Sequence, residues 1–305
     1  MKAKAQRLPS WLKMKFPTGY EYSRVKNLTR RHHLHTICSS GNCPNIGDCW
    51  SRGTATFMIL GDVCTRNCKF CGVKSGKPEP PDRGEPARIA ESIRLLGLRH
   101  CVVTSVDRDD LPDLGAGIWA ETIRCIKEVN PETGIEVLIP DFNADHSLIK
   151  QVTDMRPDVV SHNLETVRRL TPVIRSRARY ETSLEVIRFV ASQGVRSKSG
   201  IMLGLGETRE EVLETMDDLV SAGCEIMTIG QYLAPTAGHM PVADYIRPEV
   251  FEEYRLIGLE KGFSFVESSP LVRSSWQADR HARSTENVNN SKYVKKSNLP
   301  GPRVR

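Results

Sequence analysis

The chain has 305 residues, of which 39% are hydrophobic and 26% charged, a composition typical of a globular protein and incompatible with disorder of the whole chain. No run of about 18 apolar residues occurs, and the lysine-containing start MKAKAQRLPSWLKMKFP has no apolar stretch of the kind found in secretion signals. These features argue against a membrane or secreted protein and predict a cytoplasmic one.

The net charge of +6 is unevenly distributed. Residues 1–36 contain nine Lys or Arg and one acidic residue, and residues 277–305 contain seven and two, which leaves a charge of −7 for the middle. Few apolar residues and a Pro-Gly-Pro close favour a solvated tail over residues 277–305. Nucleic-acid binding is not expected, because no aromatic residues alternate with the basic ones. An acidic protein partner for the N-terminal segment stays open.

From residue 54 onward, short β-rich runs alternate with amphipathic helical runs. The expected strands are TATFMIL, HCVVTSV, IEVLIPD, DVVSHNL, SKSGIML and EIMTIGQYL, at residues 54–60, 100–106, 135–141, 158–164, 197–203 and 225–233. The expected helices cover residues 87–97, 117–129, 145–155, 180–194 and 208–223, the last with Thr208 as its N-cap and Gly223 as its end. This order predicts an α/β fold with a parallel sheet, and spacing alone fits both a partial (β/α)6 barrel and a doubly wound sheet. In either fold, functional residues should gather at the carboxyl ends of the strands.

Six of the nine cysteines lie between residues 38 and 71, which in a reducing compartment indicates metal binding or catalysis. The run CTRNCKFC places Cys64, Cys68 and Cys71 directly after the first strand. Three thiolates could hold zinc with a fourth ligand from elsewhere, or an iron–sulfur cluster with one iron left open. An open iron at the mouth of a parallel α/β fold would be a catalytic arrangement.

The CxxxCxxC spacing, with Phe70 before the last cysteine, resembles the signature of radical S-adenosylmethionine enzymes. The resemblance implies that the three cysteines hold a [4Fe–4S] cluster and that S-adenosylmethionine binds the free iron. It also implies electron transfer that releases a 5′-deoxyadenosyl radical. The partial barrel that it implies, TIM-like with six units, agrees with the number of strand–helix units.

A second triplet, CSSGNCPNIGDC, contains Cys38, Cys43 and Cys49. Zinc sites usually have cysteines in closer pairs, so this wider spacing favours a second iron–sulfur site. The triplet lacks a fourth ligand nearby. Of the neighbouring His32, His33 and His35, only His35 remains a candidate for that position.

The two triplets, followed by VTSVDRDD, HNLETV, KSGIMLGLGET, TIGQYLAPT and PLVRSSW, are similar to the lipoyl synthase family from about Trp11 to Ala278. In that family a C-terminal serine is the fourth ligand of the auxiliary cluster, which corresponds to Ser275. Without the resemblance, a serine that caps a turn would be the simpler interpretation. The implied division is an N-terminal extension at 1–53, a barrel at 54–262, a C-terminal segment at 263–276 and a tail at 277–305, with both extensions covering the barrel mouth.

The resemblance implies the insertion of sulfur at C6 and C8 of an octanoyl chain attached to a lysine of a carrier domain. Unactivated methylene carbons offer neither an acidic proton nor a leaving group, so a radical from a cofactor is required. The implied catalytic residues are the three barrel cysteines and Ser275, with the auxiliary [4Fe–4S] cluster as the sulfur donor. The implied partners are octanoylated 2-oxoacid dehydrogenase E2 domains or glycine cleavage H protein, a flavodoxin- or ferredoxin-type reductant and an iron–sulfur carrier.

Polar residues after the strands are predicted to face the cofactor. The residues predicted to face the cofactor are Phe70, Ser105, Asp107, Asn163, Glu165, Arg175, Gly204, Gly206 and Glu207. Weaker candidates are Arg108, Asp109 and Arg273. For GLGET, a loop with a helix cap is an equally good interpretation. The remaining cysteines, Cys101, Cys125 and Cys224, fall in strand or helix patterns and are expected to pack in the core.

The sequence departs from the family pattern in four places: Trp276 replaces Tyr, SSGN replaces an acidic run, DLGA replaces Asp-Gly-Gly-Ala, and PDFNAD replaces a glycine-containing loop. None of these changes removes a proposed ligand. Leu and Asn in the two loops are expected to alter loop shape, since they tolerate fewer backbone conformations than Gly. Two other functions stay open: a radical enzyme of the biotin-synthase or methylthio-transferring kind, and a non-catalytic iron–sulfur or zinc module.

Overall fold

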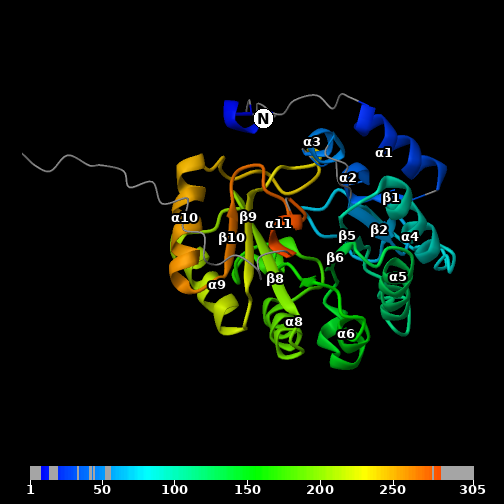
Figure 1. The fold of residues 1–305 in the computed structure, drawn as a ribbon. Helices are drawn as coiled ribbons and strands as arrows, with labels where there is room; N and C mark the ends of the chain where they lie inside the picture. The colour runs from blue at the N-terminus through cyan, green and yellow to red at the C-terminus, as the bar shows by residue number, and fades with distance from the viewer. Residues whose placement is uncertain are drawn as a thin grey trace, which may run out of the picture.

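The computed structural model describes residues 8–13, 20–32, 34–40, 43, 45–51, 56–276 and 278–282. Their central feature is a curved sheet in the order β1-β2-β5-β6-β7-β8-β9-β10 (Figure 1). The six predicted strands are β2 (Thr56–Ile59), β5 (His100–Ser105), β6 (Gly134–Leu138), β7 (Val159–Ser161), β8 (Arg196–Leu203) and β9 (Ile226–Gln231). All five contacts between neighbours in this set are parallel, as predicted.

Two further strands extend the sheet beyond the prediction. β10 (Phe265–Ser268) pairs in parallel with β9, and β1 (His35–Thr36) pairs antiparallel with β2. β10 falls in the segment that was expected to follow the barrel, so the parallel sheet has seven strands. The curved arrangement confirms a partial barrel rather than a flat, doubly wound sheet.

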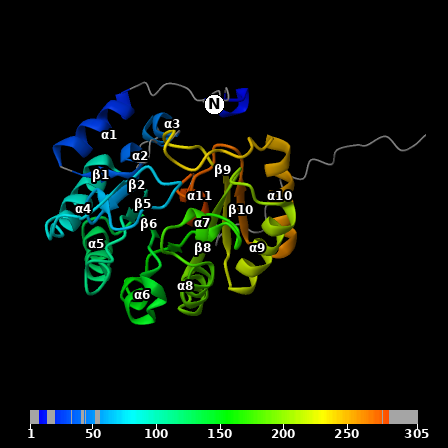
Figure 2. The same ribbon diagram turned by 180° about the vertical axis from the view of Figure 1, so that it is seen from behind.

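Helices cover the outer face of the sheet (Figure 2). They are α4 (Glu85–Leu96), α5 (Ala116–Val129), α6 (His146–Thr153), α8 (Tyr180–Ser192), α9 (Arg209–Ser221) and α10 (Pro248–Lys261). The short helix α7 (Thr171–Ile174) lies instead at the carboxyl ends of the strands, where its Ile174 carbonyl accepts from the Lys69 N–H. In α9, Val212, Met216 and Leu219 are fully buried against the sheet, as the helical period predicts. The Thr208 side chain and Glu211 form a reciprocal capping box, which explains why the helix begins there. No helix among the described residues has the length and hydropathy of a membrane span.

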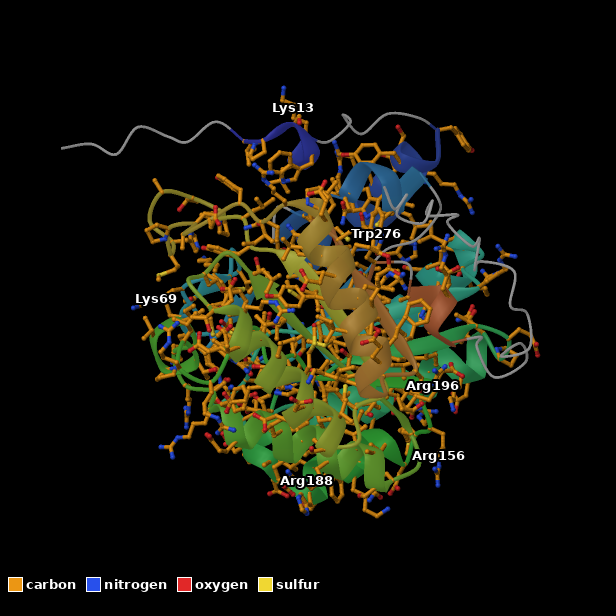
Figure 3. The ribbon with its side chains drawn as sticks, turned by 90° about the vertical axis from the view of Figure 1, so that its left-hand side faces the viewer. Lys13, Lys69, Arg156, Arg188, Arg196 and Trp276 are labelled. Carbon is orange, nitrogen blue, oxygen red and sulfur yellow. The ribbon has the colours of Figure 1, made fainter. Side chains whose placement is uncertain are left out.

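The N-terminal segment lies across one end of the barrel (Figure 1). It contains η1 (Ser10–Leu12), α1 (Tyr20–Arg31), α2 (Ile37–Ser40) and α3 (Ile46–Ser51). The last described helix, α11 (Ala278–Ala282), packs against β5 and β6. Figure 3 shows Trp276 in the same half of the molecule as the N-terminal segment, with Arg188 at the opposite end. The predicted tail falls outside the described residues except for α11.

The two loops that depart from the family pattern keep a backbone conformation that favours glycine. Leu114 has a φ of 52° and Asn143 a φ of 53°, both in the left-handed region. Such a conformation costs a residue with a Cβ atom roughly 1–2 kcal/mol. Leu114 is therefore strained in a conformation that glycine would adopt freely, whereas Asn143 is better tolerated, because asparagine is enriched among the non-glycine residues of the left-handed region.

Candidate active site

A cavity of about 470 Å³ lies among the carboxyl ends of the strands. Its size is within the usual range for small-molecule sites. The lining includes Cys38 and Cys43 of the first triplet, all three cysteines of the second triplet, and Ser275. One chamber thus receives groups from both ends of the chain.

The loop that carries Cys64, Cys68 and Cys71 is closed by a short parallel ladder. β3 (Val63–Cys64) pairs with β4 (Lys74–Ser75), and the Gly76 N–H donates to the Cys64 carbonyl at 2.9 Å. The Lys69 N–H donates to the Ile174 carbonyl at 2.8 Å, while the Lys69 side chain points outward into solvent (Figure 3). Backbone bonds therefore hold the loop while its thiols face the cavity.

Arg66, inside this loop, is clamped by carboxylates from two strand ends. Its guanidinium donates to Asp109 at 2.8 and 2.9 Å and to Asp141 at 2.7 and 2.8 Å, and Asp107 lies 3.4 Å away. Burial alone would raise the pKa of Asp141, but its bonds to Arg66 bring it well below the usual range. Sequence reasoning missed Arg66 and Asp141, because no local pattern reveals an ion pair across 75 residues.

Burial raises the pKa of four cavity thiols, those of Cys38, Cys43, Cys64 and Cys71, and so favours their protonated form. It raises the pKa of Cys38 and of Cys64 to about 11, with Cys43 and Asp107 respectively adding to the effect. Burial, with a contribution from the nearby Cys68, raises the pKa of Cys71 to about 12. Metal binding at either triplet must therefore displace protons, which favours loading at higher pH.

The C-terminal segment 271–276 lies against the first cysteine triplet. The Asn45 side chain donates to the Leu271 carbonyl at 2.6 Å. Arg273 is close enough to Cys43 to lower the pKa of that thiol, against the larger effect of burial. Ser275 follows directly and lines the cavity. The structure thus brings Ser275 to the same chamber as Cys38 and Cys43.

Two predicted residues of this site lie outside the cavity lining. Cys49 is on α3, and His35 is in β1, where its backbone pairs with Met58. No group of three His, Cys, Asp or Glu side chains among the described residues is arranged to hold a single metal ion.

The cavity wall also carries buried polar atoms that have no hydrogen-bond partner among the described residues. They are Ser105 Oγ, Asn163 Oδ1 and Arg175 Nε, all on residues that line the cavity. Unpaired buried polar atoms cost free energy, and a polar ligand can satisfy them. All three residues were predicted to face a cofactor, and these unpaired atoms fit a ligand with amino, carboxylate and hydroxyl groups.

Glu165 and His162 complete this wall. Burial raises the pKa of Glu165, while Arg175 and a bond from Asn163 at 3.1 Å oppose that rise. Burial, with a contribution from Arg175, lowers the pKa of His162 to about 4. The neutral ring lies 3.0 Å from the Ile139 carbonyl and 2.9 Å from the Ser183 hydroxyl. Nδ1 therefore carries the proton and donates to the carbonyl. His162 was not predicted, although it begins the HNLETV motif.

Three predicted cofactor residues do not reach the cavity. Glu207 turns back and accepts from the Gly204 and Leu205 N–H groups at 2.6 and 2.9 Å. A Cβ atom on Gly204 would lie 2.4 Å from the Asp244 carbonyl oxygen, so glycine is needed there for protein packing. Gly206 is also absent from the lining. The loop-and-cap interpretation describes this segment.

Most of the remaining predicted residues lie in ion pairs, on the cavity lining or in the core. Arg108 is buried and pairs with Asp110, and Asp109 belongs to the Arg66 clamp. Phe70, Asp107 and Arg273 line the cavity. Cys101 and Cys224 are buried in the core, as expected, whereas Cys125 is only partly buried on α5.

Comparisons with known proteins agree with this geometry. Residues 58–219 match the profile of the Radical SAM superfamily, and the chain belongs to that superfamily. Membership implies a [4Fe–4S] cluster and S-adenosylmethionine as cofactors. Residues 1–43 match the N-terminal domain of lipoyl synthase of the Radical SAM family.

The chain is 60% identical over 277 residues to lipoyl synthase of Bacteroides thetaiotaomicron, covering 91% of this chain and 98% of that one. It is 57% identical over 279 residues to lipoyl synthase of Treponema denticola, covering 92% and 96%. Within the superfamily, the chain belongs to the lipoyl synthase family.

Solved structures support the fold alone. Streptococcus suis SuiB bound to S-adenosylmethionine is similar with a TM-score of 0.57 at 12% identity, over 74% of this chain and 55% of that one. Methylornithine synthase (PylB) is similar with a TM-score of 0.53 at 14% identity, over 82% and 83%.

Proposed function

We propose that this enzyme is a lipoyl synthase, a sulfurtransferase that inserts two sulfur atoms at C6 and C8 of a protein-bound octanoyl-lysine. The observation that carries the proposal is the single cavity lined by Cys64, Cys68 and Cys71, by Cys38 and Cys43 of the other triplet, and by Ser275. A radical enzyme that carries its own sulfur source needs two iron–sulfur sites open to one substrate chamber. The family membership of the chain agrees with this requirement.

Cys64, Cys68 and Cys71 would hold the radical-generating [4Fe–4S] cluster. With S-adenosylmethionine bound, that cofactor pair would supply a 5′-deoxyadenosyl radical, which is reactive enough to abstract a hydrogen atom from an unactivated C–H bond. The chain's contribution is positional. The Arg66 clamp and the β3–β4 ladder hold the loop in one conformation, and the apolar side chains of Ile139, Met202 and Tyr232 line the cavity.

Ser105, Asn163, Glu165 and Arg175 would bind S-adenosylmethionine. Glu165 can accept from the ammonium group, while Arg175 and Ser105 can donate to oxygen atoms of the cofactor. The unpaired polar atoms of Ser105, Asn163 and Arg175 support this assignment.

Cys38, Cys43, Cys49 and Ser275 would hold the auxiliary [4Fe–4S] cluster, which supplies the inserted sulfur. The approach of residues 271–275 to Cys43 supports Ser275 as the ligand from the C-terminal segment. Serine oxygen is a harder ligand than thiolate, which gives this site an unequal set of ligands.

The substrate would be an octanoylated carrier, either a 2-oxoacid dehydrogenase E2 domain or glycine cleavage H protein. A flavodoxin- or ferredoxin-type protein would supply electrons, and an iron–sulfur carrier would restore the auxiliary site. The cavity lining includes Leu138, Ile139 and Leu233, which suit an alkyl chain.

Anaerobic incubation with reductant, S-adenosylmethionine and an octanoyl-lysine peptide tests the proposal. Mass spectrometry should show the gain of two sulfur atoms, and the reconstituted protein should contain about eight irons per chain. An unmodified octanoyl group alongside sulfur insertion into another small substrate would support the biotin-synthase-like alternative. One or two zinc ions in place of iron would contradict any radical mechanism.

A further inference from the structure

Gly230 occupies an unusual position on β9. It lies in a regular part of the strand, paired with Met202 of β8, and its φ is not in the positive range that favours glycine. Glycine in a strand interior weakens the strand, and such a residue often marks a close approach of another backbone. Backbone conformation therefore does not explain the glycine at this position.

The close approach is made by the C-terminal segment 271–276. A Cβ atom on Gly230 would lie 2.1 Å from the Val272 carbonyl oxygen, 3.0 Å from its carbonyl carbon and 3.3 Å from Arg273 Nη1. Two of these three atoms are backbone, so a change of rotamer cannot relieve the overlap. Any larger residue at position 230 must move the segment away from β9.

The same segment has a second contact on the cavity wall. Asn163 Nδ2 donates to the Ser274 hydroxyl at 2.6 Å and also to Glu165 at 3.1 Å. Ser274 lies between Arg273, which is beside Cys43, and Ser275, which lines the cavity. The residues before and after Arg273 are thus both held in place. Val272 packs against Gly230 of β9, and Ser274 is bonded to Asn163, which follows β7.

We propose that Gly230 and the Asn163–Ser274 hydrogen bond are positioning contacts that, together with the Asn45–Leu271 bond, seat segment 271–276 and thereby bring Ser275 to Cys38 and Cys43. This inference rests on the proposed function, because it assigns the contacts a role in forming the auxiliary site. Neither Gly230 nor Ser274 is itself a ligand in that proposal. Their effect on the site passes through the position of Ser275.

Gly230→Ala is the direct test, and Gly238→Ala is its matched control. A Cβ atom on Gly238 has only an ordinary contact of 3.7 Å with Thr236. After anaerobic reconstitution, the control should contain about eight irons per chain and Gly230→Ala about four, since only the barrel triplet keeps its full set of ligands. Hydrogen exchange of the metal-free protein should be faster over residues 271–276 in Gly230→Ala alone.

Ser274→Ala supplies a second test that adds no bulk, so it remains informative even where Gly230→Ala fails to fold. Loss of one buried hydrogen bond should speed exchange in residues 271–276 about tenfold, with a partial loss of iron. Unchanged exchange and iron content in Ser274→Ala, or in folded Gly230→Ala, would overturn the inference. A wild-type protein that contains only about four irons would instead overturn the proposed function, so the two failures are distinguishable.

Discussion

The two cysteine triplets differ in how the chain builds them. Cys64, Cys68 and Cys71 lie within eight consecutive residues, and backbone bonds and the Arg66 clamp hold their loop. The other site takes its cysteines from near one end of the chain and Ser275 from near the other. Asn45 and Leu271, separated by 226 positions, form one of the bonds that join these ends. The first site is local and rigidly enclosed, whereas the second depends on two segments that dock on the barrel.

This difference suits the two duties that the proposed function assigns to these sites. A site that generates radicals in every turnover benefits from a fixed geometry. A site that gives up its sulfur must be taken apart and rebuilt, and a ligand on a docked segment can be withdrawn without unfolding the barrel. The architecture therefore predicts that the contacts holding the first site contribute more to the free energy of unfolding than those holding the second site.

The largest expected effect separates the two triplets by function. Cys68→Ala should abolish reductive cleavage of S-adenosylmethionine, because the radical-generating cluster loses a ligand. Cys43→Ala should still form 5′-deoxyadenosine but add no sulfur to an octanoyl-lysine peptide. Chromatography of the nucleoside and mass spectrometry of the peptide measure both. Sulfur insertion by Cys43→Ala would contradict the division of roles.

A second comparison concerns the forces that hold each site. Arg66→Met leaves Asp141 buried without its ion-pair partner and Asp109 with only the exposed Arg177 among the described residues, and should lower the free energy of unfolding by roughly 3–5 kcal/mol. Asn45→Ala removes one neutral hydrogen bond and should cost only about 1 kcal/mol. Urea unfolding of the metal-free protein measures both.

Arg255→Met provides the surface control for that experiment. Arg255 pairs with Glu252 on the exposed face of α10, and its loss should change stability by less than about 0.5 kcal/mol. Equal effects of Arg66→Met and Asn45→Ala would show that the two sites are held with similar strength.

The third prediction concerns the pH dependence of stability, to which the buried His162 contributes. The pKa of His162 falls from 6.5 in the unfolded chain to about 4 in the folded one, so the unfolded state binds more protons between these values. Stability of the wild type should therefore fall by about 3 kcal/mol relative to His162→Asn as the pH drops from 7 to 4. Burial raises the pKa of Asp107 to about 6, which acts in the opposite direction. That contribution is common to both proteins and cancels in the difference, so parallel stability curves would refute a buried, neutral His162.

Residues of the site that follow local rules were predictable. The CxxxCxxC loop, and the polar residues Ser105 and Asn163 at strand ends, could be placed because parallel strands present their carboxyl ends at one edge. Glu207 was ambiguous, because a carboxylate after a glycine-rich turn can serve a ligand or its own backbone, and only the structure shows the latter.

The amino-acid sequence was sufficient to predict the alternation of strands and helices, the capping of α9 and the composition of the cysteine loop. Each of these features depends on the spacing of residues close together in the chain. Periodicity and local hydrogen bonding are nearly sufficient to predict structure at that range. Tertiary structure alone decided that β10 joins the sheet, that Arg66 is clamped by Asp109 and Asp141, and that Ser275 reaches the first triplet. Those outcomes depend on packing between distant segments, such as the backbone of Val272 against Gly230, and no local pattern contains the distances involved.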